Sequence, residues 1–435
     1  MKKDIVMVVL AAGSGKRFWP FVTDKNLFPF LGKPMFDYAF PASLPPEIVR
    51  CVIVTNPENR TIFSGMTLPI PHTVVVQEKP TGMADAVVSA RQEIQGKSIL
   101  IVIADDISDP SLIGDMLRTV RPDITGVLTG WKPETYFPGG YIVFREDRPI
   151  GIREKPGEGK TPSDYVYFGG QYIDNADKLL AAIASVNSQS DDVYEQALTR
   201  LMSETRFTMV PYEQQFVSLK YPWHVLDVMT YLLGHHMKAG RGKNVEIRNN
   251  VSLEGAVYLG NNVRIFENTK IVGPVFIGDN TIIGNNNMIR DSYIGENCVT
   301  GFNTDITRSY VGNHCWFHSN YIGDSVLEGN VSMGSGSVLA NLRLDEGNIY
   351  SSVAGGKHNT YRTKLGAMIA RDVRIGVNAS IMPGIKIGTN SCVGAGVVLD
   401  TDVPADSFCV GTRGYTITKN IKKISDDRAT YKAKL

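Results

Sequence analysis

The chain has 435 residues, of which 43% are hydrophobic and 20% charged, and its formal net charge is +1. This length predicts two or three domains, and the composition is ordinary for a globular protein. The balanced charge gives no electrostatic argument for binding nucleic acid or an anionic membrane, and no apolar run approaches the ~20 residues of a membrane span.

The first residues and the cysteines indicate a reducing compartment. The basic start is interrupted by Asp4, and a glycine-rich loop follows where a signal-peptide cleavage site would be. The five cysteines are odd in number, scattered and without a CxxC pair. This pattern is typical of free thiols rather than of a disulfide frame or a zinc site. We therefore expect a cytoplasmic protein.

The first part of the chain alternates short β-branched runs with helical stretches, as in a doubly wound α/β domain. Continuous apolar runs predict central parallel strands at 5–10, 51–55, 73–77 and 98–103. Helices are predicted at 83–94, 192–203 and 221–239. We expect a Rossmann-like domain, a mostly parallel sheet with helices on both faces, over residues 1–237, and a linker over 238–245.

The first predicted strand runs directly into a glycine-rich loop. The loop reads Leu10, Ala11, Ala12, Gly13, Ser14, Gly15, Lys16, Arg17. In an open α/β sheet, ligands bind at the carboxyl ends of the strands, and glycines let backbone N–H groups turn toward an anion. The loop is not a P-loop, because Arg17 stands where Ser or Thr is required, and it lacks the third glycine of a dinucleotide loop. It predicts a phosphate site of another kind.

The residues that follow, FWPFVTDKNLFPFLGKPM from Phe18 to Met35, extend the pattern. Together with the loop they resemble the signature of sugar-1-phosphate nucleotidyltransferases, LAAGxGxRxxPxT followed by KxLxPxxGKP. The resemblance implies that residues 10–15 bind the nucleotide. It also implies that Arg17 holds the leaving pyrophosphate and that Lys25 neutralises the phosphates at the reacting centre.

Three later segments continue the resemblance in order. Gln77 and Gly82 match the segment that reads a pyrimidine base, which implies UTP or dTTP as substrate. A sugar 1-phosphate would be bound by residues that match the family's sugar-binding elements: Gly139, Glu154, Lys155 and Gly170. Phe168 departs from the family pattern, where many members have Asn.

The metal site follows from the same resemblance. Asp105 matches the strand-end carboxylate that binds Mg²⁺, with Asp106 beside it. The family's second ligand position holds His224, and Asp227 lies one helical turn further on. Mg²⁺ prefers oxygen ligands, so either Asp227 joins Asp105 at the ion by acting through a water, or the ion relies on Asp105 and the triphosphate. A third alternative is a domain that binds nucleotide sugars but turns over slowly.

Residues 246–400 follow an irregular six-residue repeat, as in IGDN at 277–280 and IGNN at 283–286. Glycines recur in steps of 6, 11, 12, 17 or 18 residues. We expect the aliphatic residue before each glycine to point inward and the following Asn or Asp to take a left-handed turn. Such hexapeptide arrays build a left-handed parallel β-helix. We place this domain at 246–420, with an inserted loop near 343–365, and a tail at 421–435.

Part of this array resembles the amino-sugar acetyltransferase half of bifunctional GlmU-type enzymes, in particular archaeal ones. The matching segments are HSNYIGD, beginning at His318, and GSGSVLANLR, ending at Arg343. The resemblance implies that His318 is the general base that deprotonates the amine of an amino-sugar 1-phosphate. Tyr321 and Asn341 would help to hold the sugar and the acetyl donor, acetyl-CoA.

The resemblance covers nearly the whole chain and implies a homotrimeric, Mg²⁺-dependent nucleotidyltransferase that also N-acetylates an amino sugar. Two alternatives remain. The β-helix could serve only to form trimers, or the chain could be a catalytically weak regulatory subunit that binds nucleotide sugars.

Overall fold

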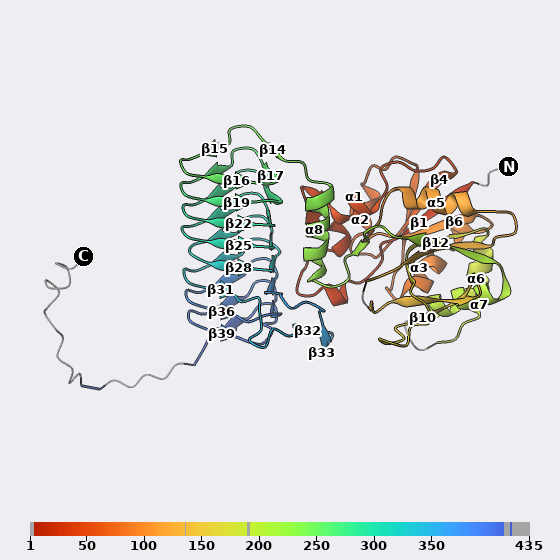
Figure 1. The fold of residues 1–435 in the computed structure, drawn as a ribbon. Helices are drawn as coiled ribbons and strands as arrows, with labels where there is room; N and C mark the ends of the chain where they lie inside the picture. The colour runs from red at the N-terminus through yellow and green to blue at the C-terminus, as the bar shows by residue number, and fades with distance from the viewer. Residues whose placement is uncertain (1–3, 135, 189–191, 413–417, 420–435) are drawn as a thin grey trace.

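The computed structural model describes residues 4–134, 136–188, 192–412 and 418–419. It has an α/β domain and a prism of stacked coils, with the long helix α8 (His224–His235) between them (Figure 1). None of the helices in this described part of the chain is long and apolar enough to span a membrane. The tail expected at 421–435 lies outside the described residues.

A mixed nine-stranded sheet forms the centre of the N-terminal domain. Its strands are β10 (Arg148–Glu154), β9 (Gly140–Arg145), β11 (Val166–Ile173), β6 (Ser98–Ile103), β1 (Ile5–Leu10), β4 (Ile48–Thr55) and β5 (His72–Val76), with β8 (Gly126–Trp131) and β12 (Phe207–Tyr212) paired beyond β11. The pairs β1/β4, β1/β6 and β4/β5 are parallel, whereas β11 runs antiparallel to β6. The predicted central strands are therefore confirmed.

Helices and short strands surround this sheet. They are α1 (Met35–Ala39), α2 (Arg60–Ser64), α3 (Met83–Ser89), α4 (Arg91–Ile94), α5 (Ser111–Thr119), α6 (Ala176–Ala184), α7 (Val193–Glu204), the 3₁₀ turns η1 (Lys16–Phe18) and η2 (Lys25–Leu27), and the strands β2 (Pro29–Phe30), β3 (Lys33–Pro34), β7 (Asp106–Ile107) and β13 (Val217–Ser218). The helix predicted at 83–94 is divided at Ala90, and the helix predicted at 221–239 is shorter at both ends.

Three parallel sheets form the C-terminal prism. The domain-facing sheet contains β14 (Gly240–Arg241), β17 (Val257–Leu259), β20 (Val275–Ile277), β23 (Tyr293–Ile294), β26 (Tyr310–Val311), β29 (Val326–Leu327), β34 (Met368–Ile369) and β37 (Lys386–Ile387). The second sheet contains β15 (Glu246–Ile247), β18 (Arg264–Ile265), β21 (Ile282–Ile283), β24 (Val299–Thr300), β27 (Trp316–Phe317), β30 (Ser332–Met333), β35 (Arg374–Ile375), β38 (Cys392–Val393) and β40 (Phe408–Cys409). The third contains β16 (Ser252–Glu254), β19 (Lys270–Val272), β22 (Met288–Arg290), β25 (Asp305–Thr307), β28 (Tyr321–Gly323), β31 (Val338–Leu339), β36 (Ser380–Ile381) and β39 (Val398–Leu399).

The hexapeptide pattern explains these coils. Ile277, Ile283 and Ile294 precede glycines and are fully buried. Asn262 and Asn280 take positive φ angles of 57° and 58° at one corner, and their side chains bond to each other across 18 residues. The inward aliphatic residues and the left-handed Asn turns are confirmed, and with them the predicted fold of both halves.

Gly278 illustrates why the repeat requires glycine. A Cβ atom there would lie 2.7 Å from the backbone carbonyl carbon of Gly295 in the next coil. The coils are therefore stacked too closely at this corner for any side chain.

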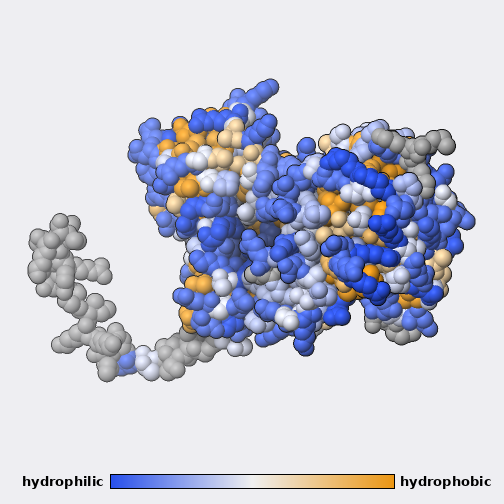
Figure 2. All heavy atoms as spheres, turned by 45° about the vertical axis from the view of Figure 1, so that its right-hand side comes forward, coloured by the Kyte–Doolittle hydropathy of each residue, from blue (hydrophilic) through white to orange (hydrophobic). Residues whose placement is uncertain are grey.

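Two features of the C-terminal half differ from the prediction. The first strand, β14, already pairs with β17 and lies within the segment expected to be a linker. The segment expected as a loop near 343–365 contains a hairpin of β32 (Tyr350–Val353) and β33 (Gly356–Asn359), which reaches toward the N-terminal domain (Figure 1). On the face drawn in Figure 2, hydrophobic residues of both domains come to the surface among hydrophilic ones.

Candidate active sites

The glycine loop lies where three parallel strands end. The backbone N–H of Ala11 donates to the carbonyl of Val54 at 2.8 Å, just before β4 ends. On the other side, Ala104 donates to the carbonyl of Leu10 at 3.1 Å, just after β6. The residues that follow β1, β4 and β6 therefore meet at the carboxyl edge of the sheet, where ligands bind in open α/β folds.

An ion pair joins the loop region to the predicted metal site. Nζ of Lys25 lies 2.5 Å from Oδ2 of Asp105. Asp105 is 2% exposed and the Lys25 side chain 20%. The lysine also passes the glycine loop, because a Cβ atom on Gly13 would lie 3.6 Å from Cε of Lys25. The glycine loop, Lys25 and Asp105, which come from three separate sequence motifs, are thus in contact with one another.

Asparagines outside the predicted set hold the loop in place. Asn59 donates to the carbonyl of Ala11 at 3.0 Å and to Oδ2 of Asp24 at 2.9 Å. Asn56 donates to the carbonyl of Gly13 at 3.4 Å. Asp24 therefore ties the lysine segment to the loop. Sequence analysis missed both asparagines; the only signal was that Asn56 directly follows the buried strand β4, with Asn59 three residues further on.

The positive end of the loop is open to solvent. Gly15 has a φ of 63°, which a residue with a side chain rarely adopts, and it leads into η1. Arg17 lies in η1 and is exposed, as is Ser14. An incoming polyphosphate can reach this guanidinium group without displacing other side chains of the core.

The two residues predicted to read the base contact each other. Gln77 is 3% exposed, and its Nε2 donates to the carbonyl of Gly82 at 3.2 Å. Gly82 has a φ of 122° and directly precedes α3. Because the side-chain amide is held at one atom, its remaining donor and acceptor have a defined direction.

Two adjacent carboxylates follow β6, and both are buried. Oδ1 of Asp106 accepts a hydrogen bond of 2.5 Å from the hydroxyl of Ser218. Burial raises the pKa of Asp106 to about 6, and the negative charge of Asp105 contributes, whereas Lys220 opposes the shift. Carboxylate oxygens are the ligands that Mg²⁺ prefers, commonly one or two together with substrate phosphates. The residues at this strand end therefore fit such an ion.

Asp227 forms an ion pair with the C-terminal domain. Its carboxylate pairs with Arg362, which follows the hairpin, and nothing in the described ranges bonds it to Asp105. The described residues also contain no group of three or more His, Cys, Asp or Glu side chains arranged to hold a metal. Burial lowers the pKa of His224 to about 4, and its Nδ1 lies 3.0 Å from the carbonyl oxygen of Ser218. Asp227 is thus engaged by Arg362 in this structure, and its part in a metal site stays a prediction.

Three of the predicted sugar-binding residues lie together. The N–H of Lys155 donates to the carbonyl of Gly139 at 3.1 Å, and its Nζ lies 3.3 Å from Oε1 of Glu154. Gly170 instead lies within β11, where its carbonyl accepts a hydrogen bond of 3.1 Å from Thr129. Phe168 is 5% exposed and packs in the core, so its replacement of Asn leaves no polar group there.

The β-helix carries the second predicted site. His318 is exposed on a corner of the coil, and its backbone N–H donates to Oδ1 of Asn320 at 2.8 Å. A Cβ atom on Gly323 would lie 2.6 Å from Nδ2 of Asn341 and 2.7 Å from the hydroxyl of Tyr321. Tyr321 and Asn341 therefore meet above Gly323.

An acidic residue in the motif organises this second site. Asp324 is 5% exposed and accepts from Nδ2 of Asn341 at 2.5 Å. Arg308 donates to both its oxygens at 2.7 Å. Such bidentate pairs are strong and fix orientation, so Asp324 and Arg308 orient Asn341. Neither residue was assigned a role from the sequence, although Asp324 stands in the matched motif.

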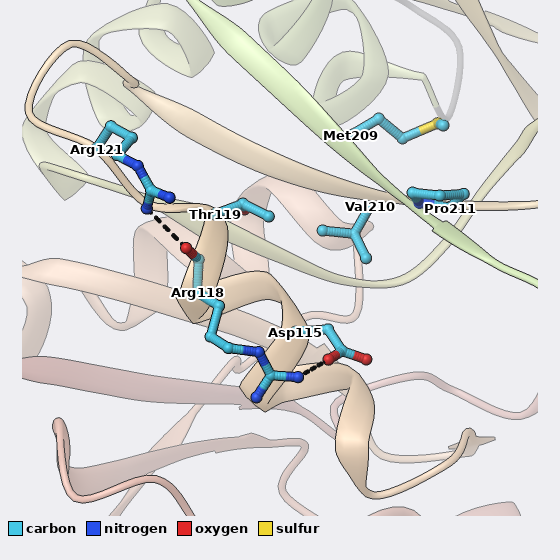
Figure 3. Close-up of a pocket in the computed structure, with 7 residues that line it drawn as sticks. All are labelled: Asp115, Arg118, Thr119, Arg121, Met209, Val210 and Pro211. Carbon is cyan, nitrogen blue, oxygen red and sulfur yellow. Dashed lines mark hydrogen bonds and ion pairs between the residues drawn. The ribbon is translucent and has the colours of Figure 1, made fainter.

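A shallow depression elsewhere on the N-terminal domain contains none of these residues. It lies between α5 and β12 and is lined by Asp115, Arg118, Thr119, Arg121, Met209, Val210 and Pro211 (Figure 3). Arg118 pairs with Asp115, and Arg121 donates to the carbonyl of Arg118 at 2.7 Å. Its two cations are therefore already engaged locally.

Comparison with known proteins agrees with this geometry. Residues 6–213 match the nucleotidyl transferase family, and residues 366–401 match the bacterial transferase hexapeptide repeat. The chain joins a nucleotidyl transferase domain to a hexapeptide-repeat domain. The glycine loop, Lys25 and Asp105 all lie inside the nucleotidyl transferase match, whereas Asp227 lies outside it.

Two relatives of this two-domain transferase align with most of its length. A bifunctional sugar-1-phosphate nucleotidylyltransferase/acetyltransferase of Sulfurisphaera tokodaii is 28% identical, covering 92% of this chain and 98% of the relative. The bifunctional protein GlmU of Methanococcus vannielii is 27% identical, over 92% of this chain and 96% of the relative. A glucose-1-phosphate thymidylyltransferase of Neisseria meningitidis is 27% identical over only 39% of this chain and 61% of its own length. The resemblance to archaeal bifunctional enzymes is thereby confirmed.

Proposed function

We propose that the protein is a bifunctional enzyme that makes a nucleotide sugar and acetylates an amino-sugar 1-phosphate. The observation that carries the first activity is the Lys25–Asp105 ion pair beside the glycine loop, at the carboxyl ends of β1 and β6. The Sulfurisphaera tokodaii relative, which has both activities in its name and aligns over 92% of this chain, supports both halves of the proposal.

In the first reaction, a phosphate oxygen of the sugar 1-phosphate attacks the α-phosphorus of UTP or dTTP. The new P–O bond forms as the bond to the β-phosphate breaks, and pyrophosphate leaves. The protein contributes positioning and charge neutralisation rather than covalent chemistry. Arg17 would hold the pyrophosphate, Lys25 the reacting phosphates, and Gln77 and Gly82 the base.

The buried carboxylates would hold the metal. Asp105 is the proposed Mg²⁺ ligand, with the triphosphate supplying further oxygens, because Asp227 is paired with Arg362. When bound, the ion would neutralise charge on the phosphates. Glu154 and Lys155, which lie together with Gly139, are proposed to bind the sugar hydroxyls and phosphate.

The proposed substrate is UTP or dTTP, and the sequence does not separate the two. Uracil and thymine present the same hydrogen-bonding edge and differ by one methyl group, which is worth about 1 kcal/mol in a pocket.

The second reaction would take place on the β-helix. His318 is proposed to remove a proton from the sugar amine, which then attacks the thioester carbon of acetyl-CoA and displaces the CoA thiol. Tyr321 and Asn341, which meet above Gly323, would bind the sugar and the acetyl donor. Exposed apolar residues along the second sheet, among them Trp316 (52% exposed) and Phe408 (71%), support assembly as a homotrimer. The five unpaired cysteines support a cytoplasmic location.

The test is a product assay with purified protein alone. NTPs are screened against hexose and amino-hexose 1-phosphates, with and without acetyl-CoA, and pyrophosphate, nucleotide sugar and free thiol are measured. We expect pyrophosphate release with UTP or dTTP and acetylation of an amino-sugar 1-phosphate. Nucleotidyl transfer without acetylation would favour a β-helix that only forms trimers. Activity that appears only with a second polypeptide would favour a regulatory subunit.

A further inference from the structure

A buried carboxylate of the β-helix binds the catalytic segment of the other domain. Glu328 follows β29 and is 6% exposed. Its side chain accepts hydrogen bonds from the backbone N–H groups of Thr23 at 2.8 Å and Val22 at 3.1 Å. It also accepts from the N–H of Arg371 within the β-helix, at 3.0 Å. One carboxylate thus joins backbone segments of two domains.

The backbone of Glu328 is fixed by the coils on both sides. The N–H of Glu328 donates to the carbonyl of Ile369 at 2.9 Å in the next coil. A Cβ atom on Gly312, in the preceding coil, would lie 2.0 Å from the carbonyl oxygen of Glu328, so the coils fit closely there. The β-helix therefore offers a fixed acceptor to the N-terminal domain.

The two N–H donors lie between the catalytic cations predicted for nucleotidyl transfer. Val22 and Thr23 separate Arg17 from Lys25 in the sequence. On the far side of Lys25, the hydroxyl of Tyr310 in the β-helix donates to the carbonyl of Pro29 at 2.7 Å. The segment that carries Lys25 is thus attached to the β-helix on both sides.

Contacts of aromatic rings reinforce this attachment. The rings of Phe28 and Phe30 lie 5.2 and 5.6 Å from the fully buried ring of Tyr310. Nζ of Lys386, in β37, lies 5.4 Å from the ring of Trp19. The signature segment therefore packs on the domain-facing sheet as well as on its own domain.

We infer that Glu328 is a positioning residue for nucleotidyl transfer, which fixes the segment carrying Arg17 and Lys25 from the neighbouring domain. The inference rests on the proposed function of that segment. Hydrogen bonds to an ionised acceptor are about twice as strong as neutral ones. A displacement of ~1 Å at a catalytic group can cost ~100-fold in rate.

The test is Glu328→Gln in the full-length protein, with Glu246→Gln as the matched control. Glu246 lies in β15, and its partner is the exposed Arg248. The glutamine side chain introduced at position 328 has only one acceptor oxygen, and its NH₂ group would face the backbone N–H donors. We expect kcat for nucleotidyl transfer to fall ~10–100-fold in Glu328→Gln, with a smaller change in KM. The control should keep the wild-type kcat.

Amide hydrogen exchange supplies a readout that a general loss of stability would not reproduce. In Glu328→Gln, peptides spanning residues 18–30 should exchange faster, while peptides from 257–300 in the β-helix keep the wild-type rate. Wild-type kcat in Glu328→Gln would overturn the inference, and so would equal acceleration across the β-helix.

Should Glu328→Gln fail to fold, exchange in the wild-type protein decides. Protected amides at Val22 and Thr23 support the contact, and exchange at the rate of an unstructured peptide would overturn it. An inactive wild type with protected amides would refute the proposed function, and with it the kinetic role of Glu328, while leaving the contact intact.

Discussion

Lys25 is the residue on which the proposed nucleotidyl transferase site is centred. Its ammonium group lies against Gly13 and pairs with the buried Asp105, so its position is defined before any substrate binds. A positive charge placed in advance stabilises the charge that develops on phosphate oxygens without having to reorganise.

Replacing this charge should disable the first activity. We expect Lys25→Ala to lower pyrophosphate release at least ~100-fold, the scale of losing one electrostatic stabiliser. The exposed Lys97 of the same domain provides the control, and Lys97→Ala should retain wild-type turnover. Wild-type pyrophosphate release from Lys25→Ala would refute the assignment.

His318 should be required for the second activity only. His318→Ala is expected to abolish acetyl transfer, because the proposed base is lost, and to leave nucleotidyl transfer intact. A matched control is His314→Asn, since His314 is exposed and has a φ of 62°, which Asn tolerates. Thiol release from acetyl-CoA measures the first effect. Normal acetylation by His318→Ala would exclude this base.

Residues with a local signature were predictable, and residues that act across the fold were not. Gly13, Lys25 and Asp105 stand in ordered motifs, and the structure brings them together. Asn59 and Glu328 support the same site from segments that are distant in sequence, so no spacing pattern marks them. Asp227 was expected to face the metal, but its partner Arg362 comes from the other domain.

At the scale of elements, the periodic parts of the chain were predicted well and the irregular ones poorly. The β-helix follows from its repeat, because each inward aliphatic residue has an equivalent in the next coil. The hairpin of β32 and β33 interrupts that repeat and was expected only as a loop. The hairpin is held by a contact with a distant part of the chain, because the hydroxyl of Ser351 donates to the carbonyl of Gly384 at 2.8 Å.

The strand β37 places a buried lysine between the domains. Lys386 is 1% exposed, and its Nζ lies 5.4 and 5.8 Å from the rings of Trp19 and Trp223. It also donates to the carbonyl of Ser352 in the hairpin. Burial lowers the pKa of Lys386 to about 8, and Asp402 only partly opposes the shift.

This shift predicts a stability that rises with pH. The folded protein loses the proton of Lys386 near pH 8, whereas the unfolded chain keeps it up to about 10.5. Between these values the unfolded state binds more protons, so the free energy of unfolding increases, by up to about 3 kcal/mol. Urea unfolding from pH 7 to 10 should show this rise in the wild type and a flatter profile in Lys386→Met. Identical profiles would contradict the buried position of the lysine.

At the scale of the whole molecule, the two domains form one unit through the signature segment. Phe28 and Phe30 are at most 1% exposed, and they share a hydrophobic core with Tyr293 and Tyr310 of the β-helix. The rings of Tyr258, Phe276, Tyr293 and Tyr310 stack in series along the domain-facing sheet. The β-helix is therefore part of the core that supports the first active site.

Separating the domains should therefore damage the nucleotidyl transferase. A fragment of residues 1–237 would expose Phe28, Phe30 and the face of α8 that packs near β26. Exposed apolar patches of this kind promote aggregation. We expect the fragment to unfold at lower temperature and to lose most pyrophosphate release relative to the full chain. A soluble fragment with full activity would show that the β-helix is dispensable for the first reaction.

The most direct test of the account is a crystal structure of the full-length protein with UTP and Mg²⁺. We predict that the triphosphate lies along the glycine loop, contacts Arg17 and Lys25, and shares the metal ion with Asp105. A nucleotide bound elsewhere, with Arg17 directed into solvent and Lys25 still paired only with Asp105, would contradict it.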